Sequence, residues 1–146
     1  MEQTIKRTVL LDIRSCIDTD GDVDETLITT VGQFYRLGDD WYLSYQDQGD
    51  SPSDRTRTTI KVRPDGEVII ARSGSISGRI LLRTGERTLF TYYTPYGELE
   101  LTARSWETFT ETDGRSGRLR LRYDIGTDDS RISENTIDIT FKESAK

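Results

Sequence analysis

Histidine is absent from this sequence, and cysteine occurs once, as Cys16. Without histidine the chain cannot form a Ser-His-Asp or Cys-His catalytic centre, a His-ligated zinc site or a His-ligated haem. A single cysteine also excludes an internal disulfide and a thiolate-bound metal cluster within one chain. We therefore predict no catalytic residue of these classes, no metal site and no cofactor.

Long hydrophobic runs are also missing, because hydrophobic residues make up only 33% of the chain and charged residues 32%. No apolar run approaches the roughly 20 residues that a membrane helix needs. The first residues, MEQTIKRTVLLDIRSC, lack the pattern of a secretory signal peptide. We expect a soluble, cytoplasmic protein whose 146 residues form one domain, 1–146.

The sequence has fewer positive than negative residues: 20 Lys and Arg against 26 Asp and Glu, which gives a net charge of -6. Nucleic-acid binding depends on Lys and Arg at the phosphates, and anionic membranes attract the same residues. The charge therefore argues against nucleic acid and membrane surfaces as partners.

Alternation of apolar and polar residues dominates the chain, and no helical stripe of ten or more residues is present. Turn signals separate ten predicted strands, at 5–16, 27–37, 41–46, 55–63, 67–73, 78–83, 88–94, 98–109, 118–125 and 132–142. A polar loop, 47–54, is the connection expected to be most mobile. Short links favour antiparallel neighbours, and closure removes sheet edges. We predict an all-β fold, a single antiparallel barrel of eight to ten strands, closed or nearly closed, with mostly up-and-down connections.

The stretch IDTDGDVDET resembles a calcium loop at first sight. With Gly21 in the sixth place, Asp18 and Asp20 stand correctly in the third and fifth places of an EF-hand loop. Cys16 and Leu27 then occupy the first and twelfth places, where ligands are required, and the flanking patterns are strands. We predict a solvated Asp-Gly turn between the first two strands.

The stretch TYYTPYGELE predicts a hairpin whose turn contains Tyr96. A three-residue loop with a glycine bulge would place Tyr93 on the face of Leu99, whereas an even loop would place Tyr92 there. The spacing leaves both registers open. The turn either packs its aromatic rings or lines the mouth of a cavity with tyrosines.

Arg72, in VIIARSGSISG, follows two apolar residues at the strand period. If those residues face the barrel interior, Arg72 does as well, and it then needs a carboxylate or an anionic ligand. Glu134 is the expected partner, with Glu98 or Glu100 as alternatives. The other interpretation is an arginine that reaches solvent at a strand end.

The stretch GRLRLRYD alternates Arg118, Arg120 and Arg122 with apolar residues. This basic stripe could contact an anion or a partner. Cross-strand pairing is the simpler interpretation. The expected partners are Glu98, Glu100 or Asp138.

The order of several longer stretches resembles the YwiB-like family of small bacterial proteins. These stretches are GQFYRLGDDWYLSYQD, RTTIKVRPDGEVIIARSGSISGRILLRTGER, YYTPYGELELTAR and GRLRLRYDIGTDDSRISENTIDITF. The most specific pieces are YLSY at 42–45, Arg72 with Gly74, TPYG at 94–97 and SEN at 133–135. The resemblance implies a calycin-like (lipocalin-type) barrel and carries no assigned function.

Three functions fit these features. The first is a non-enzymatic module that binds a small anionic or amphipathic ligand in the barrel interior or mouth. Its predicted ligand-binding residues are Arg72, Tyr42, Tyr92, Tyr93, Tyr96 and Glu134. The second is a protein-interaction barrel with a packed interior, as a monomer or a homodimer, marked by an exposed apolar patch with Trp41 or Trp106. The third, an enzyme that uses carboxylates, requires an interior pair of acidic residues with raised pKa.

Overall fold

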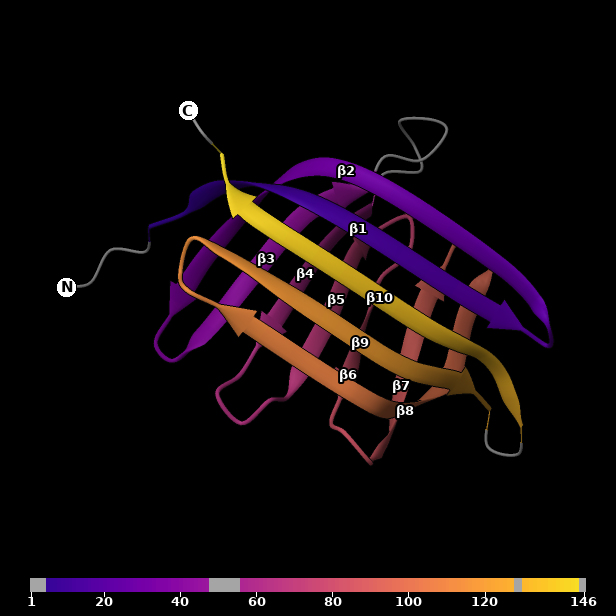
Figure 1. The fold of residues 1–146 in the computed structure, drawn as a ribbon. Coiled ribbons are helices and arrows are strands. Elements are labelled where there is room, and N and C mark those ends of the chain that lie inside the picture. The colour runs from indigo at the N-terminus through magenta and orange to yellow at the C-terminus, as the bar shows by residue number, and fades with distance from the viewer. Residues whose placement is uncertain (1–4, 48–55, 128–129, 145–146) are drawn as a thin grey trace.

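A computed structural model describes residues 5–47, 56–127 and 130–144. Their strands are β1 (Arg7–Thr19), β2 (Asp22–Leu37), β3 (Asp40–Asp47), β4 (Thr56–Val62), β5 (Val68–Gly74), β6 (Gly78–Leu82), β7 (Arg87–Thr94), β8 (Gly97–Thr112), β9 (Ser116–Gly126) and β10 (Arg131–Glu143). Figure 1 shows these strands curving around a common interior. Beyond Asp47, the polar loop predicted at 47–54 lies outside the described residues.

Strands that follow one another in the chain pair, except β6 and β7, and β1 also pairs with β10. The sheet order is β6-β5-β4-β3-β2-β1-β10-β9-β8-β7, and every pairing in it is antiparallel. Up-and-down connections follow from short turns, because a tight hairpin can join only antiparallel strands. The predicted connectivity is confirmed.

A seam between β6 and β7 nearly closes the barrel. Ser77 and Tyr93 exchange two backbone hydrogen bonds, with N–O distances of 3.0 and 2.8 Å. Further along, the amide of Gly85 donates to the carbonyl of Ser105 at 2.8 Å. These few bonds join the two ends of the sheet, so the prediction of a closed or nearly closed barrel of eight to ten strands is confirmed.

The alternation of apolar and polar residues along the strands determines which side chains form the core. In β1, Val9, Leu11 and Ile13 are buried, and the residues between them are exposed. One end of the interior is filled by Phe34, Trp41 and Phe141. The ring centroids of Phe34 and Phe141 lie 5.2 Å apart, and those of Phe34 and Trp41 lie 5.5 Å apart. We call this the closed end. The expectation that Trp41 marks an exposed patch is wrong, because its inward parity buries it.

The acidic turn is as predicted. Thr19 pairs with Asp22, so Asp20 and Gly21 form a two-residue hairpin loop with φ of 58° and 92°. Both angles are positive, as a type I′ turn requires. The Asp18 carboxylate accepts a hydrogen bond from the amide of Gly21 at 2.8 Å, so this acidic side chain supports the turn.

The β1–β2 hairpin extends beyond the end of β3. β2 pairs with β1 from Asp22 to Phe34, but it pairs with β3 only from Gly32 to Leu37. Figure 1 shows the tip of this hairpin extending past the end of β3. Within the described ranges, no helix is long and apolar enough to cross a membrane.

Candidate ligand site at the barrel mouth

The end of the barrel opposite the aromatic cluster contains a pocket of about 290 Å³. We call this end the mouth. Its lining comes from β1, β5, β7, β9 and β10, so residues far apart in the sequence meet there. The pocket lies where the inward-facing residues change from large aliphatic side chains to polar ones.

Arg72 and Tyr92 meet in this pocket. Arg72 follows the buried Val68 and Ile70 on the inner face of β5, and Tyr92 follows the buried Phe90 on β7. The Nη1 atom of Arg72 donates a hydrogen bond to the hydroxyl of Tyr92 at 3.3 Å. The bond connects strands on the two sides of the seam, which explains why sequence distance alone does not reveal it.

Gly78 makes room for this contact. It pairs directly with Arg72 across β5 and β6, and the Tyr92 ring lies against it. A Cβ atom at position 78 would approach the Tyr92 ring and the Thr91 carbonyl oxygen to 2.4 and 2.7 Å. Only glycine therefore allows Tyr92 to reach Arg72 without a shift. The sequence alone does not reveal this role, because a glycine in a strand pattern does not show which ring packs on it.

The opposite wall carries polar side chains from β10. The Asn135 amide donates to the Ser133 hydroxyl at 3.0 Å and to the carbonyl of Tyr123 at 3.4 Å. Asn135, Ser133 and Tyr123 are all buried. Ile17 and Ile137 add apolar surface beside them. The pocket therefore combines hydrogen-bonding groups with an aliphatic lining.

The two phenols of the pocket are neutral at physiological pH, and burial moves their pKa values further above it. Burial raises the pKa of Tyr92, although the nearby Arg72 opposes the shift. Burial also raises the pKa of Tyr123 to about 12, again against the effect of Arg72. Neutral phenols can donate as well as accept hydrogen bonds. The fixed charge among these groups is the positive charge of Arg72.

The register of the tyrosine hairpin selects Tyr92. Thr94 pairs with Gly97, so the loop has two residues, and Tyr92 pairs with Leu99. Tyr93 consequently points to the outer face and is 52% exposed, and Tyr96 at the tip is 99% exposed. Of the two open registers, the structure adopts the even loop.

Tyr42 also lies on the outer face of the barrel. Its ring stacks on Tyr35 with centroids 4.9 Å apart, and the Lys61 ammonium lies 5.7 Å from its centre. Buried Trp41 and Leu43 take the inward positions on β3. The structure therefore separates Tyr42 from the mouth pocket.

Glu134 does not contact Arg72, so the expected pairing is wrong. Its carboxylate accepts a hydrogen bond from Arg131 at 2.8 Å. In β10 the odd-numbered residues from Ile137 to Phe141 are buried and face inward. The same alternation turns Ser133 and Asn135 inward and leaves Glu134 on the outer face. A register irregularity between Arg131 and Ser133 adds to the effect, since it removes the alternation on which the prediction depended.

Glu98 and Glu100, the alternative partners, alternate with Leu99 and Leu101, which pair with the inward-facing Tyr92 and Phe90. The two glutamates therefore occupy the outer parity of β8. The structure does not bring either of them to Arg72 from the inner face.

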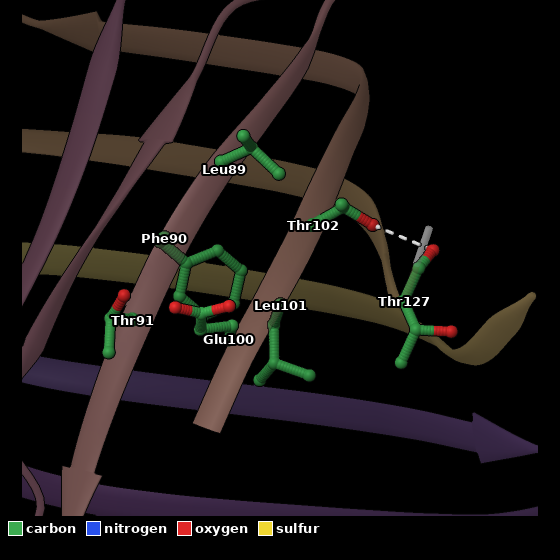
Figure 2. A pocket seen from close by; sticks show the side chains of 7 residues that line it. All are labelled: Leu89, Phe90, Thr91, Glu100, Leu101, Thr102 and Thr127. Atoms are coloured by element: carbon green, nitrogen blue, oxygen red, sulfur yellow. Dashed lines mark hydrogen bonds between the residues drawn. The ribbon is translucent and has the colours of Figure 1, made fainter. Parts of the chain in front are cut away.

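A second hollow, of about 410 Å³, lies along the tyrosine hairpin (Figure 2). β7 contributes Leu89 and Phe90 to it, and Glu100 comes from β8. Thr102 donates a hydrogen bond to the carbonyl of Thr127 at its side, with a distance of 3.5 Å. Glu100 is the ionisable group of this lining, so the hollow offers an anion no positive charge from its described wall.

An enzyme that uses carboxylates would require a pair of acidic residues in the barrel interior, and the described residues contain no such pair. Glu67 is the acidic residue that is buried among the described residues, and only 4% of it is exposed. It forms ion pairs with Arg63 and Arg83 at the β4–β5 turn, on the side of the closed end. This single carboxylate, held by two arginines, stabilises a turn and does not form an acidic pair.

The outer face of β8 and β9 holds the remaining candidates. Trp106 is 49% exposed, and the guanidinium of Arg104 covers its ring at 4.6 Å. In the basic stripe, Arg118 pairs with Asp138 at 3.3 Å. Cross-strand pairing of Arg118 with Asp138 is as predicted.

Known proteins match the chain along most of its length. The family model described as Domain of unknown function (DUF1934) covers residues 11–139. The uncharacterized beta-barrel protein YwiB of Bacillus subtilis (strain 168) is 29% identical over 134 residues, which are 92% of each chain. The crystal structure of the ywiB protein from Bacillus subtilis superposes with a TM-score of 0.85 at 27% identity, over 96% of this chain and 94% of that one. The resemblance to the YwiB-like family is confirmed: this chain belongs to the DUF1934 family of β-barrel proteins.

Proposed function

We propose that this barrel binds a small amphipathic molecule with one acidic head group in its mouth. The observation that carries the proposal is the contact of Arg72 with Tyr92 inside a pocket whose other walls include isoleucines. The planar guanidinium matches a carboxylate in two parallel hydrogen bonds, and a neutral phenol beside it adds a third donor. The isoleucines would contact the apolar part of the same molecule.

The mouth, and not the deep interior, supports this function. Residues such as Leu11, Ile70 and Leu121 are fully buried and fill the barrel below the pocket. The pocket, at about 290 Å³, lies near the lower limit of ligand sites, so the molecule is small. Barrels of this class hold side chains or one small ligand, which is consistent with a calycin-like binding protein. We place this function in the cytoplasm, because a chain with one cysteine has no need of an oxidising compartment.

The test compares an acidic probe with its neutral analogue. We expect octanoate to shift the amide resonances of the mouth strands in an NMR titration, and octanamide to bind more weakly. Arg72→Gln should weaken octanoate binding about 10- to 100-fold, because a hydrogen bond to a charged group contributes about 1.5–3 kcal/mol. The variant should leave octanamide binding nearly unchanged.

Arg122→Gln is the matched control, since Arg122 is exposed on the outer face of β9. It should bind octanoate as the wild type does. Equal losses in both arginine variants, or octanoate shifts confined to the hollow at Leu89 and Glu100, would contradict the proposal. Native mass spectrometry of protein purified from its own host then identifies the retained molecule.

A further inference from the structure

Ten residues of β2 have a strand on one side only. From Asp22 to Val31, β2 pairs with β1, and its pairing with β3 starts at Gly32. Along the other edge of this segment, no strand of residues 5–47, 56–127 or 130–144 is paired. Barrels remove sheet edges by closure, and this segment lies beyond the part that closes.

The hairpin geometry shows which backbone groups face that edge. Thr19 and Asp22 close a two-residue loop, so Asp22 exchanges hydrogen bonds with β1, and the even residues after it do the same. Leu37 and Asp40 close the next two-residue loop, so the odd residues of β2 point toward the β3 side. The N–H and C=O groups of the five odd residues in 23–31 therefore point away from β1.

The composition of this edge favours strand pairing. Six consecutive residues, Thr26–Val31, read TLITTV and carry no charge, no glycine and no proline. Leu27 and Val31 are 68% and 56% exposed. Natural edges of this length are usually protected by lysine, proline or a bulge. Here Asp22, Asp24 and Glu25 protect only the first half.

We propose that β2 pairs with β2 of a second copy of this chain, in antiparallel orientation, with Leu27 on the two-fold axis. This register pairs Val23 with Val31 of the second copy, Glu25 with Thr29, and Leu27 with Leu27. All of these are odd residues, so each pair exchanges backbone hydrogen bonds through the available groups. On the outer face, the apolar side chains oppose apolar ones and the glutamate opposes a threonine.

Neighbouring registers are poorer. A shift that places Ile28 on the axis brings Asp24 opposite Gly32, whose edge is already taken by Tyr45. A shift that places Thr26 on the axis brings Leu27 opposite Glu25. The Leu27 register pairs residues 23–31, nine of the ten in the available segment, and places no like charges directly opposite each other. A self-complementary edge of this kind generates a closed two-fold dimer and stops there.

This interface is independent of the proposed ligand, because no step depends on Arg72 or Tyr92. Sedimentation velocity over a concentration series tests it first. A short strand interface is small, so we expect a reversible dimer that dominates at about 100 µM and dissociates at about 1 µM. A wild type that remains monomeric up to about 1 mM overturns the proposal.

Two matched variants locate the interface. Leu27→Lys brings two positive charges together on the axis and should weaken dimerisation at least tenfold. Leu89→Lys makes the same change at a 77% exposed position on β7 and should leave the dimer intact. If both variants dimerise alike, the β2 interface is wrong.

Cross-linking tests the register. Paired residues that exchange hydrogen bonds have Cα atoms about 5.5 Å apart, within the range of a disulfide. In a Cys16→Ser background, Leu27→Cys should therefore form an intermolecular disulfide under mild oxidation, and Leu89→Cys should not. Equal cross-linking of the two variants, or none at Leu27→Cys, overturns the Leu27 register.

Discussion

The closed end and the mouth of this barrel are built from the same strands but differ in what faces inward. At the closed end, the rings of Phe34, Trp41 and Phe141 pack together with centroids 5.2–5.8 Å apart. At the mouth, the inward positions hold groups that bear hydrogen-bonding atoms, among them Arg72 and Asn135. Stability and a candidate site are thus separated along the barrel axis, because apolar burial stabilises the fold and polar burial does so only when it is paired.

The largest expected effect is at the closed end. Phe141→Ala should lower the free energy of unfolding by about 3–5 kcal/mol, because it removes a buried ring and leaves a cavity between Phe34 and Gly117. Denaturant unfolding monitored by tryptophan fluorescence measures the loss. Ile17→Ala at the mouth, where the side chain is 42% exposed, should cost less than about 1 kcal/mol. Equal losses at the two ends would remove the distinction between them.

Alkaline pH should destabilise the protein through Tyr123, a buried residue of the mouth pocket. Burial raises the pKa of Tyr123 to about 12 in the folded state, and an unfolded tyrosine titrates near 10. The contribution of Tyr123 to the free energy of unfolding is therefore fully present below pH 10. It is lost as the pH rises to 12, because the tyrosine of the unfolded state releases its phenol proton at a lower pH than that of the folded state. The loss reaches about 3 kcal/mol, at about 1.4 kcal/mol per pH unit.

Denaturant unfolding between pH 8 and 12 measures this loss. Tyr123→Phe should reduce it, leaving the smaller part that comes from buried Tyr92, and Tyr96→Phe, at the exposed hairpin tip, should retain the wild-type profile. An unchanged pH profile in Tyr123→Phe would show that the buried phenol is not the titrating group.

The strand order could be predicted because it depends on local signals. Alternation gives each strand its inner face, and tight turns such as Asp20–Gly21 force antiparallel neighbours. The site was harder to predict, because it depends on two strands meeting across the seam. Arg72 could be assigned to the inner face from Val68 and Ile70, but no local signal indicates that Tyr92 would be its neighbour.

The predictions that left open or misplaced the face of a side chain have a common cause. A single residue decides the face, and loops or irregularities shift it. The hairpin loop at 95–96 selects Tyr92 over Tyr93, and the even spacing from Ile132 misplaces Glu134. Counting back from the buried run at Ile137 would have turned Asn135 inward. Tyr123 could have been found in the same way, since it continues the alternation of two buried leucines on β9.

A smaller change tests how the mouth is assembled. Gly78→Ala places a methyl group against the Tyr92 ring and the Thr91 carbonyl, and should cost about 1–3 kcal/mol in unfolding free energy. It should also weaken octanoate binding, because the Tyr92 hydroxyl moves away from Arg72. In a Tyr92→Ala background the same substitution should cost less, since only the Thr91 contact remains. Full additivity of the two changes would contradict this packing.

The smallest effect is expected on the outer face, away from both ends. Arg118→Gln breaks the ion pair with Asp138. The two side chains are 51% and 26% exposed, so the substitution should lower the free energy of unfolding by only about 0.2–1 kcal/mol. Water solvates both charges whether or not they pair, so the difference should shrink further in about 1 M salt. Urea unfolding at low and high salt measures it. A loss that exceeds about 2 kcal/mol, or that persists in salt, would mean that the basic stripe does more than pair across strands, and the contrast between a stabilising interior and a solvated exterior would have to be redrawn.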